Sequence, residues 1–320
     1  MRAIVVEQNG GPEVLELREV PDPVPGPGEL VVDTAAVGIN FIEIYQRGGV
    51  YPLPLPLTLG SEASGTVSAV GEGVTEFAVG DRITTSAARG TYAERFTVRA
   101  AEVAPVPDGI DLETAAALPL QGCTAHYLAT SASHPHPGDT VLVHAGAGGV
   151  GLLLTQLLVA RGVRVLTTAS SEAKRALSID AGADESFAYE GFAERARELT
   201  GGDGVAVVYD GVGKDTFDES LKALRVRGEM VLFGGSSGQV PPFDLQRLNA
   251  GGSLSVTRPS LVHFMRTPEE RAWRYGELFA ALGDGSVKFR IGERFPLARA
   301  ADAHRGLEGR GTTGKLILVP

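Results

Sequence analysis

The sequence contains a single cysteine, Cys123, among its 320 residues. One thiol excludes an intrachain disulfide and any zinc site that is built from several cysteines. We interpret Cys123 as a small buried apolar side chain rather than a reactive thiol. The chain is therefore expected to fold without covalent cross-links.

Basic residues are also scarce. The chain has 29 Lys and Arg compared with 39 Asp and Glu, which gives a formal net charge of −10. This balance argues against nucleic acid or an anionic membrane surface as the main partner. No apolar stretch is long enough to span a bilayer, and no amino-terminal export pattern is seen. We expect a cytoplasmic protein of two domains or one large domain.

Metal-ligand spacing is absent from the six histidines. Two of them, His134 and His136, alternate with prolines in a segment that is typical of a solvated loop. The sequence predicts no metal site.

Glycine, in contrast, is concentrated where residues 140–151 run TVLVHAGAGGVG. Thr140–Val143 is expected to be a short buried strand, and the glycines that follow it are in G-x-G-x-x-G register. After them apolar residues recur at helical spacing, namely Val150, Leu153, Leu154, Leu157 and Leu158. Gly162 is suited to the left-handed turn after this helix, and residues 163–168 predict a second strand.

A pyrophosphate needs such a turn, because backbone N–H groups must approach it and side chains would block that approach. The unpaired N–H groups and partial positive charge of the helix N-terminus then bind the anion. The alternative is a glycine turn that only packs a helix against a strand. The strand–turn–helix–strand order favours a dinucleotide site.

The two halves of the sequence differ in the pattern of their predicted strands and helices. Short β-type runs alternate with Gly and Pro turns in the first hundred residues, at Ala3–Val6, Glu29–Val32, Gly65–Val70 and Arg95–Val98. Residues 21–28 are rich in proline and predict a stiff surface connection. This region has no helical repeat and favours a twisted antiparallel sheet or a small barrel.

From about Thr124 helices and strands alternate instead. The expected helices are Ser171–Ala181, Phe192–Leu199 and Thr216–Leu224. One expected strand ends at Phe187, and three further strands are expected at Val205–Tyr209, Met230–Phe233 and Ser253–Thr257. Such alternation predicts a parallel sheet covered on both faces.

A long helix begins at Thr267, with Pro268 at its first position and Glu270 completing a capping box, and it extends to about Leu282. From Val287 the sequence returns to β-type runs and ends on Leu316–Val319. We expect this tail to rejoin the first domain, which would then be discontinuous.

The second strand of a nucleotide-binding unit usually ends in a carboxylate that binds the adenosine ribose. Here residues 168–171 read TASS, the first acid is Glu172, and Lys174 follows. Hydroxyls and an ammonium in place of the acid suit a 2′-phosphate and favour NADPH over NADH. Lys174 could also be an ordinary solvated helix lysine.

The sequence resembles the zinc-independent quinone oxidoreductases, the zeta-crystallin branch of the medium-chain dehydrogenase/reductase superfamily. The similarity covers nearly the whole chain and is carried by residues 38–52, 144–151, 248–254 and 256–261. The resemblance implies an α/β fold, with a Rossmann doubly wound parallel sheet at residues 126–258. A discontinuous GroES-like β-rich catalytic domain would comprise residues 1–125 and 259–320. It also implies a homodimer paired through the last Rossmann strand, Ser253–Val256.

Zinc-dependent relatives carry a cysteine ligand where this sequence has Asn40, and a histidine ligand where it has Ser61. The four-cysteine structural lobe of those relatives is missing as well. Because zinc needs thiolate, imidazole or carboxylate donors, the resemblance implies an enzyme without the metal sites of the superfamily.

The resemblance implies an NADPH:quinone oxidoreductase in which Asn40, Tyr45 and Tyr51 line the substrate space. The tyrosines could stack on a planar ring or could simply pack a loop. On the cofactor side it implies Asn40, Tyr127, Gly148, Gly149, Val150, Lys174, Tyr189, Val212, Gly234, Ser236, Ser260 and Arg310. Val212 and Gly234 have independent support, because each follows a predicted parallel strand, where open α/β sheets bind ligands.

Two alternatives remain open at this point. An NADPH-dependent reductase of α,β-unsaturated aldehydes or ketones would need almost the same site, with Tyr51 as a candidate proton donor. A nucleotide-binding structural or RNA-binding protein with little turnover is a different class. The acidic balance disfavours RNA binding, and the complete set of substrate-side residues disfavours an inactive protein.

Overall fold

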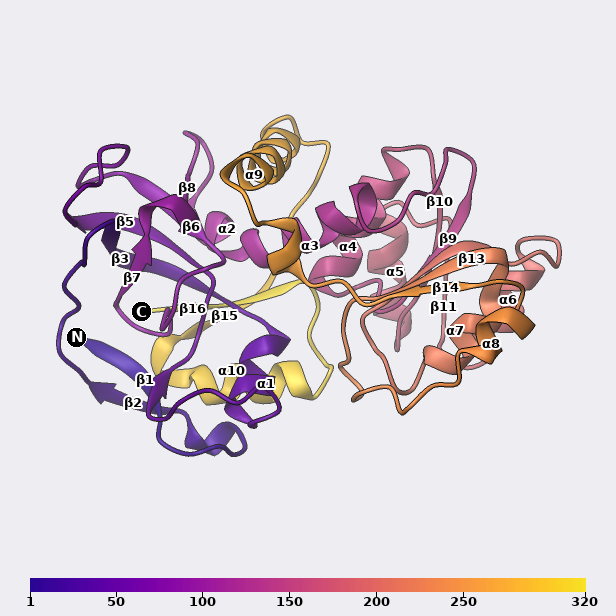
Figure 1. The fold of residues 1–320 in the computed structure, drawn as a ribbon, viewed down its shortest axis with the longest axis horizontal. Coiled ribbons are helices and arrows are strands. Elements are labelled where there is room, and N and C mark those ends of the chain that lie inside the picture. Colours follow the sequence, from indigo (N-terminus) through magenta and orange to yellow (C-terminus); the bar gives the residue numbers. More distant parts are fainter. The chain divides into compact units, whose positions relative to one another are not determined.

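A computed structural model describes all 320 residues, and the chain divides into two compact units (Figure 1). The terminal unit contains Met1–Gln121 and Thr267–Pro320, and the central unit contains Gly122–Arg266. The sequence placed the boundaries after residues 125 and 258. The contacts place them after Gln121 and Arg266.

The central unit is built on one parallel sheet, as the strand–helix alternation predicted. Its strands are β9 (Thr140–Val143), β10 (Arg164–Thr168), β11 (Glu185–Phe187), β12 (Val205–Asp210), β13 (Leu224–Leu232) and β14 (Ser255–Thr257). Their order is β11-β10-β9-β12-β13-β14, and every pairing is parallel. The order reverses between β9 and β12, which is the doubly wound arrangement of a Rossmann sheet. The predicted fold class is confirmed for this part of the chain.

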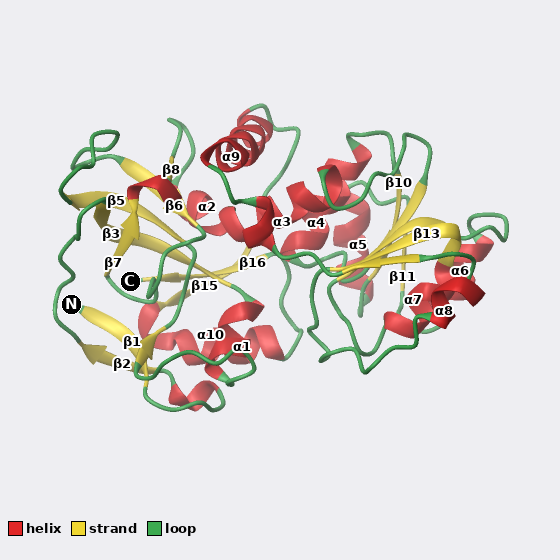
Figure 2. Cartoon of the chain, in the orientation of Figure 1, coloured by secondary structure: helices red, strands yellow, loops and turns green.

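Helices precede, connect and follow these strands (Figure 2). They are α3 (Pro119–Thr130), α4 (Gly149–Val159), α5 (Glu172–Asp180), α6 (Phe192–Glu198), α7 (Phe217–Ala223), α8 (Gln246–Ala250) and the 3-10 helix η3 (Leu261–Phe264). The predicted apolar face of α4 is buried at its leucines, and only Val150 is half-buried. Gly162 has the predicted left-handed conformation, with φ of 75°. Cys123 is fully buried in α3, as expected.

The terminal unit is rich in short strands and contains two sheets. Its strands are β1 (Arg2–Val6), β2 (Glu16–Glu19), β3 (Glu29–Ile39), β4 (Leu57–Thr58), β5 (Ala63–Val70), β6 (Arg82–Thr85), β7 (Arg95–Arg99), β8 (Ala104–Pro105), β15 (Ile291–Pro296) and β16 (Lys315–Val319). The three-stranded sheet has the order β2-β1-β4, and the seven-stranded sheet joins β15-β16-β3-β5-β6-β8 with β7 also on β3. β16 pairs antiparallel with β3, so the carboxy-terminal tail does rejoin the first part of the chain.

Four α-helices belong to the terminal unit: α1 (Phe41–Arg47), α2 (Leu112–Ala117), α9 (Pro268–Gly283) and α10 (Ala300–Glu308). α9 begins as predicted, because the Thr267 hydroxyl accepts from the Glu270 N–H at 3.2 Å and the Glu270 carboxylate accepts from the Thr267 N–H at 3.3 Å. The sequence did not predict α1, α2 or α10. All three are short, and α1 buries Glu43 and Arg47, so tertiary contacts stabilise α1 rather than a repeat of apolar residues.

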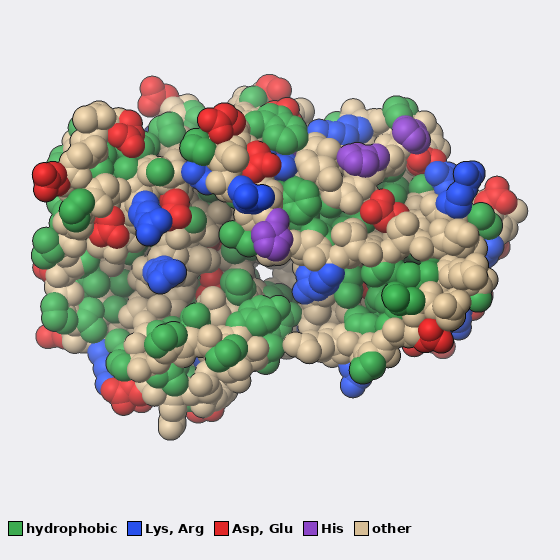
Figure 3. Space-filling view, in the orientation of Figure 1, with side chains coloured by type: hydrophobic (Ala, Val, Ile, Leu, Met, Phe, Trp, Pro, Cys, Tyr) green, Lys and Arg blue, Asp and Glu red, His purple; other side chains and the backbone are tan.

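The surface carries both signs of charge. In Figure 3 acidic and basic side chains are interspersed over the face shown. Exposed ion pairs on the protein surface include Arg95 with Asp33 and Arg164 with Asp184. Such pairs each contribute little to stability. None of the helices combines the length and the apolar character that crossing a bilayer requires.

Candidate functional site

The glycine turn between β9 and α4 forms the nucleotide-binding half of the candidate site. Gly148 is the N-cap of α4, and Gly149 and Val150 begin its first turn. The first N–H groups of a helix have no partner within the helix, so they are available to an anion. Three of the predicted cofactor residues therefore lie together at one helix N-terminus.

The outer two glycines of the motif have packing roles. A Cβ on Gly151 would lie 2.4 Å from the Ala145 carbonyl oxygen, and one on Gly146 would lie 2.7 Å from Thr167 Cβ. A Cβ on Gly148 would meet only the Ala145 oxygen, at 3.2 Å. Gly146 and Gly151 thus let the turn pack closely on β10 and α4, while Gly148 is on the open side of the turn.

The end of β10 presents hydroxyls and an ammonium in place of an acid. Ser171 caps α5, and its Oγ accepts a hydrogen bond from the Lys174 N–H at 3.3 Å. Ser170 and Ser171 are exposed, and Lys174 is half-buried. Partial burial lowers the pKa of the Lys174 ammonium. This set of donors, beside a helix N-terminus, fits a phosphate better than a ribose 2′-hydroxyl.

Tyr189, between β11 and α6, is tied to the glycine turn. Its hydroxyl accepts a hydrogen bond from the Ala145 N–H at 3.2 Å, and its ring stacks on His144 with centroids 6.0 Å apart. Ala145 itself has a positive φ of 54°. The predicted residue Tyr189 is therefore fixed against the turn that holds Gly148.

His144, directly after β9, links this strand to β10 and α7 through one chain of hydrogen bonds. Its Nδ1 lies 2.8 Å from the Thr168 hydroxyl and its Nε2 lies 2.9 Å from the Ser220 hydroxyl. Ser220 Oγ donates to Asp210 Oδ2 at 3.4 Å, so it accepts from His144 Nε2–H, and Thr168 donates to Nδ1. Burial lowers the pKa of His144, although the Asp210 carboxylate acts to raise it. The lowered pKa keeps the imidazole neutral. The histidine fixes β9, β10 and α7 relative to one another.

The remaining predicted cofactor residues of the central unit follow strands or lie near its last segment. The Val212 N–H donates to Asp210 Oδ1 at 2.7 Å after β12, and a Cβ on Gly234, after β13, would lie 2.6 Å from the Gly211 oxygen. The Ser236 N–H donates to the Gly211 oxygen at 3.1 Å. Both segments lie at the carboxyl ends of parallel strands, where such sheets bind ligands.

Tyr127 lies near the start of the central unit in sequence, and Ser260 lies near its end. Tyr127 is buried in α3, and its ring stacks on Phe264 with centroids 4.4 Å apart. Ser260 is the N-cap of η3. Arg310 is in the terminal unit, just after α10, with a positive φ of 53°. The cofactor roles of these three residues stay predictions.

The three predicted substrate-side residues lie within one short segment of the terminal unit. Asn40 is the N-cap of α1, Tyr45 is on that helix, and Tyr51 follows it. The rings of Tyr45 and Tyr51 meet edge to face, 5.5 Å between centroids. Asn40 is 4% exposed whereas Tyr51 is 41% exposed, so the segment has a buried polar end and an accessible aromatic end.

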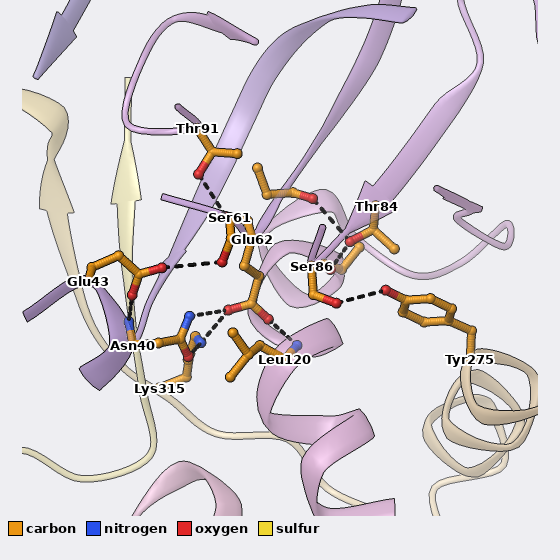
Figure 4. A network of polar contacts seen from close by, with 12 residues as sticks. Asn40, Glu43, Ser61, Glu62, Thr84, Ser86, Thr91, Leu120, Tyr275 and Lys315 are labelled. Atoms are coloured by element: carbon orange, nitrogen blue, oxygen red, sulfur yellow. Dashed lines mark hydrogen bonds and ion pairs between the residues drawn. The ribbon is translucent and has the colours of Figure 1, made fainter. Parts of the chain in front are cut away.

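Asn40 is part of a buried charged cluster that the sequence did not predict (Figure 4). Its Nδ2 donates to Glu62 Oε2 at 2.9 Å, and its Oδ1 accepts from Lys315 Nζ at 2.6 Å. The Lys315 ammonium also forms an ion pair with Glu62, and both side chains have no exposed area. Glu62 Oε1 accepts from the Leu120 N–H at 2.6 Å. Gly38 makes room for this pair, since a Cβ there would lie 2.0 Å from Glu62 Oε2.

A second buried carboxylate, Glu43, adjoins the same cluster. Its Oε2 accepts from the Asn40 backbone N–H at 2.8 Å, and its Oε1 lies 3.4 Å from the Ser61 hydroxyl. Burial raises the pKa of Glu43 to about 7; Lys315 opposes this shift and Glu62 adds to it. Glu43 is thus a carboxyl group that changes charge near neutral pH.

The cluster does not fit a zinc ion. The positions compared above with zinc ligands carry an amide, Asn40, and a hydroxyl, Ser61, which are poor zinc donors. Two carboxylates lie beside them, Glu62 and Glu43, and no group of three His, Cys, Asp or Glu side chains is present that could hold a metal ion. The Glu62 carboxylate is already neutralised by the Lys315 ammonium. A second cation next to that ammonium would be repelled.

The far end of α1 is held by a second polar chain. Arg47 Nη1 can only donate, so His304 Nδ1 accepts from it at 3.0 Å and His304 Nε2–H donates to Tyr92 Oη at 3.0 Å. Arg47 also forms an ion pair with Glu308 at 2.6 Å. Burial, with the adjacent Arg47, lowers the pKa of His304 to about 3, so it stays neutral.

Sequence reasoning missed most of these buried polar groups. The N-x-x-E spacing of Asn40 and Glu43 could have indicated a helix N-terminus. Lys315 directly before the apolar run LILV could have indicated a buried cation. The partners 253 and 275 residues away in sequence gave no such signal.

Comparisons with known proteins agree with this geometry. Residues 26–108 match the family model of the alcohol dehydrogenase GroES-like domain, and residues 149–274 match that of the zinc-binding dehydrogenases. The quinone oxidoreductase of Pseudomonas aeruginosa is 45% identical over 315 residues, which cover 97% of each chain.

Solved structures agree as well. A mycobacterial protein complexed with NADPH is 53% identical, with a TM-score of 0.98 and full coverage of both chains. The Escherichia coli quinone oxidoreductase complexed with NADPH is 41% identical, again with a TM-score of 0.98 and full coverage. With a Rossmann sheet, a GroES-like unit and relatives of this similarity over its whole length, the chain belongs to the zeta-crystallin-like quinone oxidoreductase family of the medium-chain dehydrogenase/reductase superfamily.

Proposed function

We propose that this chain is an NADPH-dependent quinone reductase that works without a metal ion. The observation that carries the proposal is the end of β10, where the exposed Ser170 and Ser171 and the half-buried Lys174 replace the usual carboxylate beside a glycine turn. The NADPH complexes of two similar proteins and the quinone oxidoreductase names of its relatives support it.

On the cofactor side, the N-terminus of α4 at Gly148, Gly149 and Val150 would bind the pyrophosphate. Lys174 and Tyr189 would bind the 2′-phosphate, the ammonium by charge and the phenol by hydrogen bonding. Val212, Gly234 and Ser236 would line the nicotinamide side, because they follow β12 and β13 at the carboxyl ends of parallel strands. We assign supporting cofactor contacts to Asn40, Tyr127, Ser260 and Arg310.

Bound NADPH supplies a hydride at C4 of its nicotinamide. A quinone accepts a hydride readily, because the product is an aromatic hydroquinone anion, so the protein mainly has to align the substrate and exclude water. Tyr45 and Tyr51, in edge-to-face contact, would hold the planar substrate ring. Asn40 donates one Nδ2 hydrogen to Glu62, which leaves the second hydrogen to bind a substrate oxygen.

We further propose that the two compact units are the catalytic and the nucleotide-binding domain. A homodimer paired through β14 is part of the same proposal. β14 is at the edge of the central sheet and Val256 on it is 36% exposed, so its outer backbone groups can pair with a second copy. Sedimentation velocity tests this, and a monomer at working concentration would contradict it. The cytoplasmic location stays a prediction.

The deciding measurement is anaerobic oxidation of NADPH, compared with NADH, by the purified protein with an ortho-quinone and a simple enone offered separately. We expect quinone turnover with a preference for NADPH. Turnover of the enone alone would move the chemistry to alkene reduction, with Tyr51 as the first candidate for proton donation. Tight NADPH binding without either turnover would indicate a binding or structural protein.

A further inference from the structure

The two buried carboxylates beside Asn40 are not equivalent. Glu62 accepts from Asn40 Nδ2 at 2.9 Å, from the Leu120 N–H at 2.6 Å and from the Lys315 ammonium. Glu43 accepts from the Asn40 backbone N–H at 2.8 Å and from the Ser61 hydroxyl at the longer distance of 3.4 Å. One ammonium cannot neutralise both carboxylates, so a proton in this cluster belongs on Glu43, which has the weaker set of donors.

The geometry also fixes which oxygen carries that proton. Glu43 Oε2 already accepts from the Asn40 N–H, so the proton sits on Oε1, which faces Ser61. Protonated Oε1 donates to Ser61 Oγ, and this leaves the serine hydrogen free to point elsewhere. Ser61 is half-buried while Glu43 is fully buried, so the hydroxyl lies between the carboxyl group and the outer side of the cluster.

We propose that Glu43 and Ser61 deliver a proton to the substrate oxygen, with Glu43 as the proton store and Ser61 as the relay. This rests on the proposed quinone reductase function. Asn40 is our candidate ligand for the substrate oxygen. Its backbone N–H contacts one oxygen of the Glu43 carboxyl group and Ser61 contacts the other, so we place the bound substrate oxygen next to Ser61. Ser61 is the catalytic residue of the pair, and Glu43 acts through it.

The step balances without a further reactant. Hydride addition to the quinone leaves a monoanion with its charge on one oxygen. The Ser61 O–H bond breaks as a new O–H bond forms on that oxygen, and the proton on Glu43 Oε1 moves to Ser61 Oγ. Ser61 ends as a neutral hydroxyl and Glu43 as a carboxylate, which takes one proton from water before the next turnover.

The charged and titratable groups around Glu43 keep this proton available near neutral pH. Lys315 on β16 and Glu62 before β5 interact with it directly, and Tyr92 before β7 interacts with Glu43, Glu62 and Arg47. His304 on α10 contacts Tyr92 and Arg47 and stays neutral. Burial outweighs Lys315 and raises the pKa of Glu43 to about 7, so the store is filled below neutral pH and empty well above it.

The pair is tested by the pH dependence of kcat and by the solvent isotope effect on quinone reduction, from about pH 5 to about pH 9. In the wild type we expect kcat to fall as pH rises through about 7, with slower turnover in D2O. Glu43→Gln keeps an acceptor for Asn40 and a donor for Ser61 but cannot release a proton. It should lower kcat about 10- to 100-fold and remove the pH step.

Ser61→Ala should lower kcat by a similar factor, and Ser61→Thr, which keeps a hydroxyl, should recover most of the loss. Ser68→Ala is the matched control, because Ser68 is on β5 and its hydroxyl donates only to the Val31 oxygen, at 3.4 Å. The ionisation of Glu43 is read independently of turnover from the infrared band of its carboxylic acid, assigned by its loss in Glu43→Gln. This band should disappear with a midpoint near pH 7 in both wild type and Ser61→Ala.

If Ser61→Ala or Glu43→Gln kept the pH dependence of kcat and the solvent isotope effect of the wild type, the relay would be overturned and the reductase proposal would stand. A Glu43 that is ionised throughout this pH range would also overturn it. Failure of the wild type to reduce any quinone would remove the function and the relay together.

Discussion

Each unit buries a polar network close to its candidate site residues, but only the terminal unit uses opposite charges. There the Lys315 ammonium and the Glu62 carboxylate pair without any exposed area, with Glu43 alongside. In the central unit a neutral His144 bridges two hydroxyls, and its only charged neighbour, Asp210, accepts from backbone N–H groups and hydroxyls. The first network can respond to pH near neutrality, while the second holds a loop in place.

The two lysines of the candidate site show the same contrast. Lys315 is fully buried and belongs to the folded core, whereas Lys174 is half-buried at the start of α5. A cation inside the protein stabilises its partner carboxylate, and a cation at the surface can attract a ligand. Four substitutions test this division.

Replacing Lys315 by Met should have the largest effect. It leaves the Glu62 carboxylate buried without a cation, which costs about 3–5 kcal/mol of unfolding free energy. Urea unfolding at neutral pH measures the loss. Combining it with Glu62→Gln should restore much of the stability, because the uncompensated charge is gone; a double variant as unstable as the single one would show that the charge is not the cause.

Glu43→Gln should change how stability depends on pH. The folded pKa of Glu43, about 7, lies above its ordinary value of 4.5, so its contribution is fully present below about 4.5 and is lost as pH rises to about 7. The wild type should therefore gain about 3 kcal/mol relative to the variant on acidification across this window. His304 is present in both proteins, so its opposite pH dependence cancels. Parallel stability curves would contradict the assignment.

Thr168→Val tests the neutral network. It removes the hydroxyl that donates to His144 Nδ1 and leaves that buried nitrogen without a partner, at a cost of about 1–3 kcal/mol. The loss should change little between about pH 7 and about pH 8, because burial lowers the pKa of His144 and the imidazole is neutral there. A loss larger than that of Lys315→Met would reverse the proposed contrast between the units.

Lys174→Ala should leave stability nearly unchanged and act on the ligand alone. We expect NADPH binding to weaken about tenfold, the scale of one charge-assisted hydrogen bond, and NADH binding to change little. Titration calorimetry with both cofactors measures this difference. Equal weakening for both would remove the 2′-phosphate assignment, and Lys222→Ala, an exposed lysine of α7 paired with Glu219, serves as the control.

The same contrast explains what could be predicted from the sequence. The central unit follows local rules: β9, the glycine turn and α4 are adjacent in sequence, and the period of the leucines reveals the helix. The capping box of α9 is equally local. The Rossmann sheet and the nucleotide turn could therefore be predicted.

The terminal unit depends instead on contacts between distant residues. α1 is stabilised by Glu43 and Arg47, whose partners include His304, 257 positions away, and Glu62 meets Lys315 253 positions away. No spacing rule connects such residues, so the charged cluster was not predicted even though Asn40 was. The resemblance implied which residues would face the ligand, and only the structure revealed the buried groups that contact Asn40.

The pairing of β16 with β3 also has a consequence for how the protein is made. Ribosomes release the chain from its amino end, so all of Gly122–Arg266 emerges before β16 and can fold first. Until Lys315 emerges, β3 lacks its pairing with β16, and Glu62 lacks its counter-ion. We expect nascent chains that stop before Lys315 to carry a finished central unit and an open amino-terminal sheet edge, the state in which chaperones have most to protect.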